Sequence, residues 1–415
     1  MSEERPVVTV GPPAHGGHCV ARLDGRVVFV RHAIEGEEVV LDVTDRRSRF
    51  WRADAVEILT PAAERVASVW PEAGPGGVGG GELAHVALPA QRAWKARVLA
   101  DTLRRIGGEE VAADVAAVRP QGVDVEALPG DDDGLATRTR IELTVDRAGL
   151  AGMHRFRSHD VLALAAMPLA AEGITGLELL GAGSPWRPTW APGARVQAVA
   201  PSAGDPLVLV DGEPAARRRT GPPRRSVRER VGTSLGELTY RVGGAGFWQV
   251  HRAAPATLVD AVLEAAAPRP GERVLELYAG AGLLSLPLAL AVGPAGGVLT
   301  VEGAADAVRD ARRNLHDQPW ATLHHGRVDP AAVAAGAGAD VVVLDPPRTG
   351  AGPGVMAAVA ALGADRVVHV ACDPAALARD LRAARDHGYV PTAVRAFDLF
   401  PHTHHFEVVV TLRRP

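Results

Sequence analysis

The chain has 415 residues, 47% hydrophobic content and a formal net charge of −4, which suits two or three globular domains. No apolar run reaches the about 18 residues that cross a bilayer, and the first ten residues lack the pattern of a secretion signal. The two cysteines, Cys19 and Cys372, are far apart, which argues against a disulfide framework. We therefore expect a cytoplasmic protein with no membrane contact. The charge excludes a uniformly basic nucleic-acid binder but not a local basic face.

Residues 1–60 are predicted to form a small β-barrel. Short β-like runs alternate there with glycine and charged turns, and Asp24-Gly25 has the composition of a hairpin turn. The runs are Val7–Val10, Arg26–Arg31, Glu38–Val43 and Trp51–Leu59.

Residues 61–234 are predicted to form an α+β central domain. A glycine run at Gly74–Gly81 marks a loop, Ala90–Ile106 has the pattern of an amphipathic helix, and Arg138–Val145 is strand-like. An arginine cluster ends the domain, either as a solvated loop or as an arm that contacts phosphate, and the sequence leaves both open. Its members are Arg217, Arg218, Arg219, Arg224, Arg225, Arg228 and Arg230.

Residues 235–415 alternate strand and helix patterns, which predicts an α/β domain with a parallel sheet. The expected strands are Arg273–Leu277, Gly297–Val301, Asp340–Leu344 and Arg366–Ala371, with a helix at Ala304–Leu315. The last two strands, Ala393–Phe397 and Phe406–Leu412, are expected to form an antiparallel pair at the sheet edge.

A glycine turn follows the first of these strands. Gly280 and Gly282 would let a ligand approach the backbone at the carboxyl end of the sheet. Such a turn also occurs in structural crossovers and in dinucleotide sites, but Ser285 stands where the dinucleotide fingerprint has its third glycine. Glu302 ends the second strand, where a carboxylate can accept from both ribose hydroxyls. Together these features favour an adenosyl cofactor.

Three further side chains stand at or near strand ends. Asp345 follows a buried strand and is either a cap or a polar contact in the cleft. Cys372 follows the next strand at a helix start, where a thiolate is favoured, although a lone cysteine is more often a small buried hydrophobe. Glu407 ends the run His402-Thr-His-His-Phe-Glu407, whose histidine spacing lacks a metal-binding pattern, so no metal is expected.

Four blocks of the sequence resemble the RNA uridine-C5 methyltransferases, which make 5-methyluridine in tRNA and ribosomal RNA. These blocks are Gly246-Phe-Trp-Gln249, the glycine turn, Asp345–Arg348 with Cys372-Asp-Pro-Ala-Ala-Leu-Ala-Arg-Asp380, and Phe400–Glu407. The first 60 residues resemble the TRAM domain (a TRAM/OB-like barrel) of that family, and the middle resembles its RNA-binding domain. In the family, the helix that matches Ala90–Ile106 packs with the catalytic domain.

The resemblance implies a class I, Rossmann-like methyltransferase that uses S-adenosyl-L-methionine. It implies that Cys372 is the nucleophile, which adds to uracil C6, and that Glu407 is the base that removes the C5 proton. The cofactor positions that it implies are Gln249, Tyr278, Glu302 and Asp345, beside the turn glycines Gly280 and Gly282. The expected partner is an RNA, ribosomal RNA in preference to tRNA, bound by a monomer. The alternatives are the same chemistry on a small molecule and a non-catalytic RNA-binding protein or RNA chaperone.

The sequence departs from the family pattern at three positions. His251 and Asp373 each replace an asparagine that is usual in the family, and Leu283 stands where an asparagine often follows the glycine turn. These departures leave the cofactor contacts open.

One branch of the family holds an iron–sulfur cluster with four cysteines. The matching positions here are Glu72, Val78, Gly81 and Met167, none of which supplies a thiolate. We therefore expect no iron–sulfur cluster.

Overall fold

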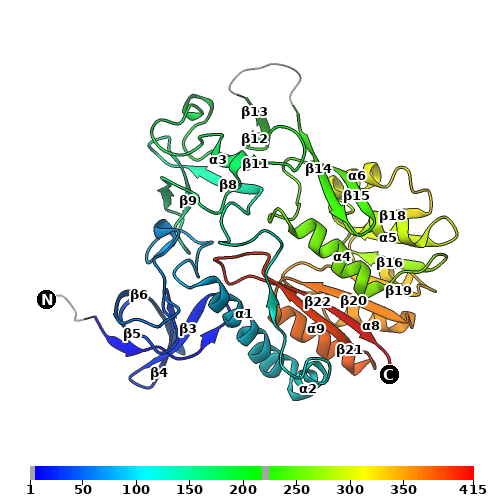
Figure 1. Cartoon of the computed structure of the whole chain (residues 1–415), viewed down its shortest axis with the longest axis horizontal. Coiled ribbons are helices and arrows are strands. Elements are labelled where there is room, and N and C mark those ends of the chain that lie inside the picture. Colours follow the sequence, from blue (N-terminus) through cyan, green and yellow to red (C-terminus); the bar gives the residue numbers. More distant parts are fainter. Residues whose placement is uncertain (1–4, 217–223) are drawn as a thin grey trace.

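The computed structural model describes residues 5–216 and 224–415. Figure 1 shows three bodies, with the N-terminal sheet beside the central sheet and both against the large α/β sheet of the C-terminal part. Among the described residues, no helix is both long and apolar enough to span a membrane.

The N-terminal body is one curved sheet of six strands, in the order β1-β5-β6-β4-β3-β2. The hairpin turn between β3 and β4 has positive φ at both Asp24 and Gly25, as two-residue hairpin turns require, so that prediction is confirmed. Backbone hydrogen bonds join Gly11 to Val20 and Val20 to Pro12, so the segment after β1 also meets β3. The strands are β1 (Val7–Thr9), β2 (Pro13–Ala14), β3 (His18–Leu23), β4 (Arg26–Arg31), β5 (Glu38–Arg46) and β6 (Phe50–Thr60).

The central body is a six-stranded antiparallel sheet in the order β10-β9-β8-β11-β12-β13. Its strands are β8 (Arg140–Val145), β9 (Ala151–His154), β10 (Val161–Ala163), β11 (Arg195–Val199), β12 (Leu207–Val210) and β13 (Glu213–Ala215), with the short helix α3 (Glu172–Thr175). The strand expected at Arg138–Val145 is thus present as β8.

The predicted helix Ala90–Ile106 is present as α1 (Leu88–Thr102), which continues into a π turn at Leu103–Gly107, followed by α2 (Glu109–Val118). Leu99, Leu103 and Val111 lie in one hydrophobic core with residues of the C-terminal sheet. The short strand β7 (Val125–Glu126) then pairs with the edge of that sheet. This part of the chain therefore packs as a portion of the α/β body.

A hairpin of β14 (Ser226–Thr233) and β15 (Gly236–Gly243) leads into the α/β body. Its apolar face, with Val231 and Tyr240, shares a core with β12 and with residues near the glycine turn such as Leu286. The boundary placed at residue 234 falls in the turn of this hairpin.

The α/β body is an eight-stranded sheet in the order β18-β17-β16-β19-β20-β22-β21-β7. Strands β16 to β20 are parallel, as predicted, because each is followed by a crossover helix. The expected antiparallel pair exists, but its place at the edge was wrong. Strand β22 lies between β20 and β21, and β7 forms the edge.

The strands of this body are β16 (Arg273–Leu277), β17 (Gly297–Glu302), β18 (Ala321–His325), β19 (Val341–Leu344), β20 (Arg366–Ala371), β21 (Val390–Phe397) and β22 (Glu407–Arg413). Its helices are α4 (Ala254–Ala266), α5 (Ser285–Val292), α6 (Ala305–Asn314), α7 (Pro330–Ala334), α8 (Pro353–Leu362) and α9 (Pro374–Asp386).

Candidate active site

The glycine turn after β16 is held open by its backbone conformation. Tyr278, Gly280 and Gly282 all have positive φ, at 66°, 56° and 87°. Glu302, at the end of β17, braces the turn, because its carboxylate accepts hydrogen bonds from the N–H of Gly280 at 2.8 Å and of Ala304 at 2.6 Å. The turn and Glu302 therefore form one unit at the carboxyl end of the sheet.

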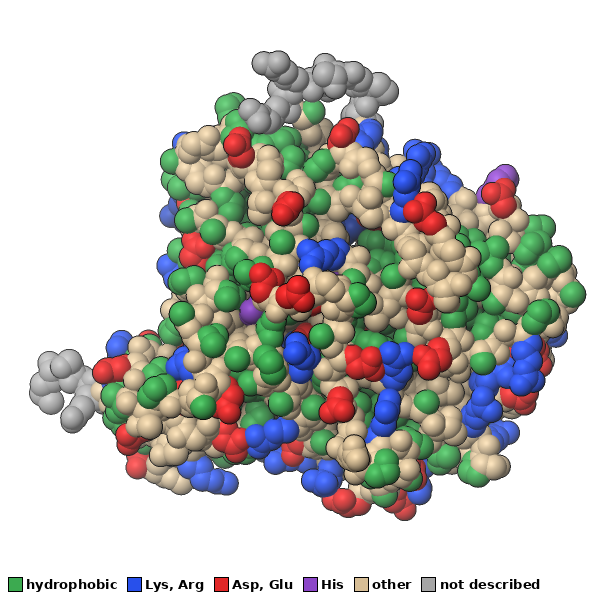
Figure 2. Space-filling view, viewed as in Figure 1, with side chains coloured by type: hydrophobic (Ala, Val, Ile, Leu, Met, Phe, Trp, Pro, Cys, Tyr) green, Lys and Arg blue, Asp and Glu red, His purple; other side chains and the backbone are tan. Residues whose placement is uncertain are grey.

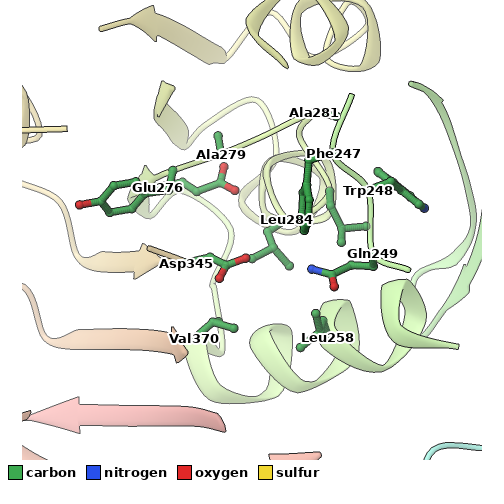
Figure 3. Close-up of a pocket in the computed structure, with 12 residues that line it drawn as sticks. Phe247, Trp248, Gln249, Leu258, Glu276, Ala279, Ala281, Leu284, Asp345 and Val370 are labelled. Carbon is green, nitrogen blue, oxygen red and sulfur yellow. The ribbon is translucent and has the colours of Figure 1, made fainter. Parts of the chain in front are cut away.

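A cavity of about 40 Å³ lies beside this turn (Figure 3). Gln249 and Asp345 point toward its centre from opposite sides. The predicted residues Gln249, Tyr278 and Asp345 line it, whereas Gly280, Gly282 and Glu302 are not among its lining residues. Its other walls are mainly apolar: Phe247, Trp248, Leu258, Glu276, Ala279, Ala281, Leu283, Leu284 and Val370.

The polar groups of this cavity fit an adenosyl cofactor. Burial raises the pKa of Asp345 to about 7, and no described side chain donates a hydrogen bond to its carboxylate. The carboxylate is thus an available acceptor for a ligand's N–H or O–H group. Phe247 is 74% exposed at the rim, where its ring can cover an aromatic base.

Glu276 is a residue of this wall that the sequence reasoning missed. It is buried in β16, where burial raises its pKa to about 8, and Ser285 Oγ donates a hydrogen bond to it at 2.5 Å. A carboxylate in the otherwise apolar run Val274–Leu277 was the signal that could have found it.

Cys372 and Glu407 come together because of the register of two antiparallel strands. Ala371 at the end of β20 pairs with Val408 in β22, so Cys372, the residue directly after β20, follows at the register position of Glu407. Val370 of the same strand lines the cofactor cavity, so the pair lies next to it. The other cysteine, Cys19, is fully buried in the N-terminal core.

Carboxylates dominate the electrostatics of this pair. Burial, then the Glu407 and Asp345 carboxylates, raise the pKa of Cys372 to about 12, while Arg348 lowers it. Burial, then Asp345, also raise the pKa of Glu407 well above its ordinary value, and Arg348 again opposes the rise. The expectation of a favoured thiolate at the helix start was therefore wrong for this state, since desolvation and negative charge outweigh the helix terminus.

The block around Asp380 fixes the loop that carries Arg348. The Asp380 carboxylate accepts hydrogen bonds from the N–H of Ala351 at 2.8 Å and of Gly352 at 3.0 Å, and it faces His369 Nε2 at 3.0 Å. Burial raises the pKa of Asp380, but its bonds to His369 and to the loop outweigh this and lower it overall. Asp380 therefore ties α9 to the loop after Asp345.

The histidine run makes polar contacts within the protein. His402 Nδ1 is 3.1 Å from Gln91 of α1, His404 pairs with Glu82 at 3.5 Å, and His405 lies 3.3 Å from Arg348. No group of three or more potential ligands that could hold a metal is found among the described residues.

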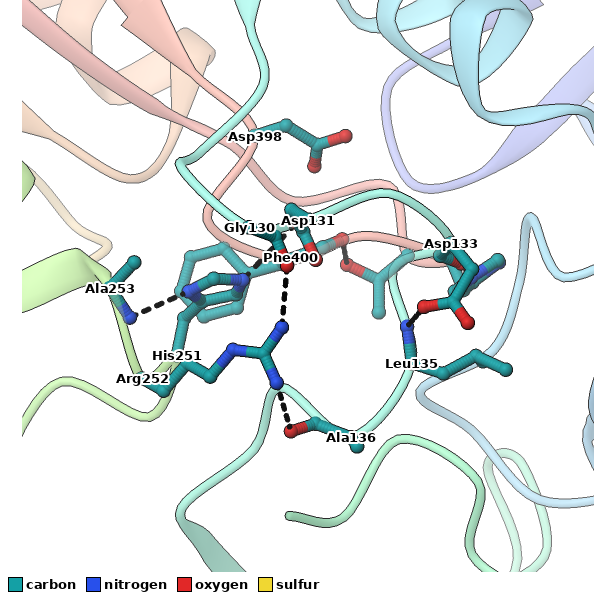
Figure 4. A network of polar contacts seen from close by, with 12 residues as sticks. Gly130, Asp131, Asp133, Leu135, Ala136, His251, Arg252, Ala253, Asp398 and Phe400 are labelled. Carbon is teal, nitrogen blue, oxygen red and sulfur yellow. Dashed lines mark hydrogen bonds and ion pairs between the residues drawn. The ribbon is translucent and has the colours of Figure 1, made fainter. Parts of the chain in front are cut away.

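The three departures from the family pattern have defined contacts. His251 accepts a hydrogen bond from Ala253 N–H at Nδ1, so its proton is on Nε2, which donates to Asp131 at 3.2 Å (Figure 4). Leu283 lines the cavity, and its carbonyl accepts from Tyr240. Asp373 caps α9, because its Oδ1 accepts from Ala376 N–H at 2.8 Å.

The arginine cluster lies partly at a cleft of about 920 Å³ between the central sheet, the β14–β15 hairpin and α6. Figure 2 shows basic side chains gathered over β14 and α6. Arg217, Arg218 and Arg219 lie outside the described residues. The arginines that line the cleft are Arg224, Arg225, Arg228, Arg230, Arg241, Arg309 and Arg313.

Most of these arginines have partners, but Arg224, Arg228 and Arg241 form no ion pair with a described residue, and Arg224 bonds to backbone carbonyls instead. Arg225 pairs with Glu213, and Arg309 and Arg313 pair with acids of their own helix. Arg228 and Arg241 stand directly opposite each other in the hairpin, and neither forms an ion pair with a described residue. Like charges in this arrangement destabilise a sheet, which favours the phosphate-contact interpretation over the solvated loop.

Comparisons with known proteins cover the whole chain. A family model described as tRNA (uracil-5-)-methyltransferase matches residues 337–415, and a TRAM domain model matches residues 5–56. An uncharacterized RNA methyltransferase of Streptomyces coelicolor is 41% identical over 98% of this chain and 92% of its own length. A Thiobacillus denitrificans protein named 23S rRNA (uracil(1939)-C(5))-methyltransferase RlmD is 31% identical over 99% of this chain and 100% of its own.

Among solved structures, a Pyrococcus abyssi tRNA (uracil-54, C5)-methyltransferase in complex with S-adenosyl-L-homocysteine is similar, with a TM-score of 0.68. The match covers 97% of this chain and 100% of that chain at 19% identity, so it shows a shared fold.

Proposed function

Because this chain belongs to the RNA uracil-C5 methyltransferase family, we propose that it converts a uridine of ribosomal RNA to 5-methyluridine with S-adenosylmethionine as methyl donor. The observation that carries this proposal is the juxtaposition of Cys372 and Glu407 across β20 and β22, next to the cavity beside the glycine turn. Ribosomal RNA is favoured over tRNA because the relative named for 23S rRNA is similar in sequence over its full length, whereas the tRNA enzyme is similar in fold alone.

The proposed reaction begins at uracil C6, because C5 is a poor nucleophile by itself. The Cys372 thiolate forms a bond to C6, and the electrons of the C5–C6 double bond move onto the C4 carbonyl as an enolate. S-adenosylmethionine, when bound, would supply the methyl group: C5 would form a bond to it as the sulfonium–methyl bond breaks, which leaves S-adenosylhomocysteine. Glu407 then removes the C5 proton, the double bond re-forms, and the Cys372 sulfur leaves C6.

The raised pKa of Glu407 suits this role, since a carboxylate of higher pKa is a stronger base once ionised. Arg348 provides the positive charge that opposes the carboxylates at both catalytic groups. The uracil must be reached face-on, so we expect the RNA to present it unstacked or flipped out.

For the cofactor, we propose contacts to Gln249, Tyr278 and Asp345 in the cavity. Glu302 would accept from the ribose hydroxyls while it continues to brace the turn of Gly280 and Gly282. The TRAM domain and the central sheet would hold the RNA. We propose that the enzyme acts as a monomer.

A covalent adduct with RNA that contains 5-fluorouridine tests this function, because fluorine at C5 cannot be removed as a proton. Mass spectrometry should find the RNA attached at Cys372, and Cys372→Ala should abolish both the adduct and methyl transfer while cofactor binding survives. Glu407→Gln should accumulate a methylated adduct on ordinary uridine. An adduct at Cys19, or methyl transfer by Cys372→Ala at near the original rate, would refute the mechanism.

A further inference from the structure

The N-terminal sheet reaches the catalytic residues through one histidine. His15 follows β2, and its Nε2 lies 3.3 Å from Oδ2 of Asp373. Asp373 is the residue directly after Cys372 in the chain. An ion pair therefore joins the N-terminal body to the covalent neighbour of the proposed nucleophile.

The loop that carries His15 is firmly packed. Gly16 and Gly17 have φ values of +102° and +75°. A Cβ at Gly17 would lie 2.9 Å from Cβ of Glu82 and 3.2 Å from Cβ of His404, so only glycine fits there. The His15 ring also meets the His404 ring edge-on, with their centroids 6.2 Å apart. The approach of His15 is thus built into the fold.

Both carboxylate oxygens of Asp373 are engaged. Oδ1 caps α9 through the N–H of Ala376 at 2.8 Å, and Oδ2 faces His15. Burial raises the pKa of Asp373, but the hydrogen bonds from His15 and Ala376 outweigh it and lower the pKa overall. Asp373 is therefore a fixed negative charge, where the family usually carries a neutral asparagine.

This negative charge acts on Cys372. The carboxylates of Glu407, Asp345 and Asp373 all oppose its ionisation, and Arg348 favours it. The charged and titratable groups of the surrounding elements are Asp345 and Arg348 after β19, Glu407 on β22, His404 and His405 before β22, Glu82 before α1, and His15. His15 is the side chain in contact with Oδ2 of Asp373, at 3.3 Å.

We propose that His15 is a positioning residue for the nucleophile: it holds the Asp373 carboxylate beside Cys372 and offsets part of its charge, so that Cys372 ionises less readily when this contact with the N-terminal body is lost. The proposal rests on the function proposed above for Cys372. It makes the N-terminal domain a contributor to the chemistry in addition to any contact that it makes with RNA.

The test measures thiol ionisation in the full-length protein without RNA or cofactor. The rate of Cys372 alkylation by iodoacetamide is followed by peptide mass spectrometry, which separates it from buried Cys19. Below its midpoint this rate is proportional to the thiolate fraction, so a rise of one unit in the pKa slows it about tenfold. We expect His15→Ala to be about tenfold slower than wild type at about pH 6.

Rescue separates this mechanism from a purely structural one. In an Asp373→Asn background, His15→Ala should slow alkylation less than twofold, because the charge that His15 cancels is gone. His154→Ala, at an exposed histidine of the central sheet, is the matched control and should change nothing. If His15→Ala fails to fold, as judged by circular dichroism, His15→Gln replaces it. An equal loss from the His15 substitution in both backgrounds overturns the proposal.

Methyl transfer provides the second readout. His15→Ala should lower kcat about tenfold and leave KM for RNA within twofold. A raised KM with unchanged kcat would make His15 an RNA contact and overturn the proposal. If alkylation responds as expected but uridine in RNA is never methylated by the wild type, the proposed function fails and the ion-pair mechanism stands.

Discussion

Arg348 is the residue whose removal should change the pH dependence of catalysis most directly. It is exposed on the loop after β19, and it lowers the pKa of both Cys372 and Glu407. Arg348→Gln keeps a polar side chain, although a shorter one, while it removes the charge. The two catalytic groups would then face Asp345 and each other without a compensating cation.

The magnitude follows from Coulomb's law. For charges roughly 6 Å apart at an effective dielectric constant of about 40, chosen because Arg348 is exposed, the interaction is about 1.4 kcal/mol. This energy corresponds to about one pKa unit for each group. The pKa of both Cys372 and Glu407 should rise, because loss of a nearby cation disfavours the thiolate and the carboxylate. The rising limb of the pH–rate profile should therefore move about one unit toward alkaline pH.

The assay is kcat/KM for methyl transfer to RNA from about pH 6 to pH 10, which lies below the raised pKa of Cys372, about 12, and so follows the rising limb. On this limb the variant should be about tenfold slower at each pH, which is the wild-type profile displaced by about one unit toward alkaline pH. Arg382→Gln, an exposed arginine on α9, is the matched control and should leave the profile in place. Arg348→Lys keeps the charge and should lose much less than Arg348→Gln. An equal loss in Arg348→Lys would refute the electrostatic reasoning and assign Arg348 to substrate binding instead.

Three further outcomes are expected. Lys95, the only lysine in the chain, is fully buried, and its Nζ lies 2.5 Å from Oδ1 of Asp398. Lys95→Met should therefore lower the free energy of unfolding by about 3–5 kcal/mol, because it leaves the buried carboxylate unpaired. Denaturant titration measures this, and a change under about 1 kcal/mol would contradict it. Arg228→Gln combined with Arg241→Gln should weaken RNA binding and reduce the log–log salt slope by about 2, measured by anisotropy, while cofactor affinity stays unchanged. An unchanged salt slope would mean that these two arginines are solvated and do not contact RNA phosphates. Protein purified without oxygen should be colourless and hold no stoichiometric iron by elemental analysis. About four irons per chain, as in a cubane site, would overturn the expectation that this chain holds no iron–sulfur cluster.

Local sequence signals were sufficient to predict many of the strands and helices and the motifs that follow the strands. Continuous apolar runs gave β16, β19 and β20, since strands buried on both faces carry no alternation. The turn glycines and Cys372 were predicted from their places directly after such strands. These features depend on a few consecutive residues, so the sequence shows them without knowledge of the fold.

Strand order and contacts between distant segments could not be predicted in this way. Nothing in residues 390–413 indicates that β22 inserts between β20 and β21, yet this insertion sets Glu407 opposite Cys372. The pairing of His251 with Asp131 spans 120 positions of sequence, and that of His15 with Asp373 joins two different bodies. The pKa of Cys372 also depends on such neighbours, which is why the helix-start argument failed.

The position of Glu407, the proposed general base, depends on the first third of the chain. The segment that leads into Glu407 begins at Asp398, which pairs with Lys95 of α1. It continues through His402, whose N–H donates to Gln91 Oε1 at 2.7 Å and whose carbonyl accepts from Leu83 N–H at 2.9 Å. These partners lie far before the α/β body in sequence, and each is buried against the segment. The active site is therefore assembled by the packing of α1 and its preceding loop as much as by the sheet that carries Cys372.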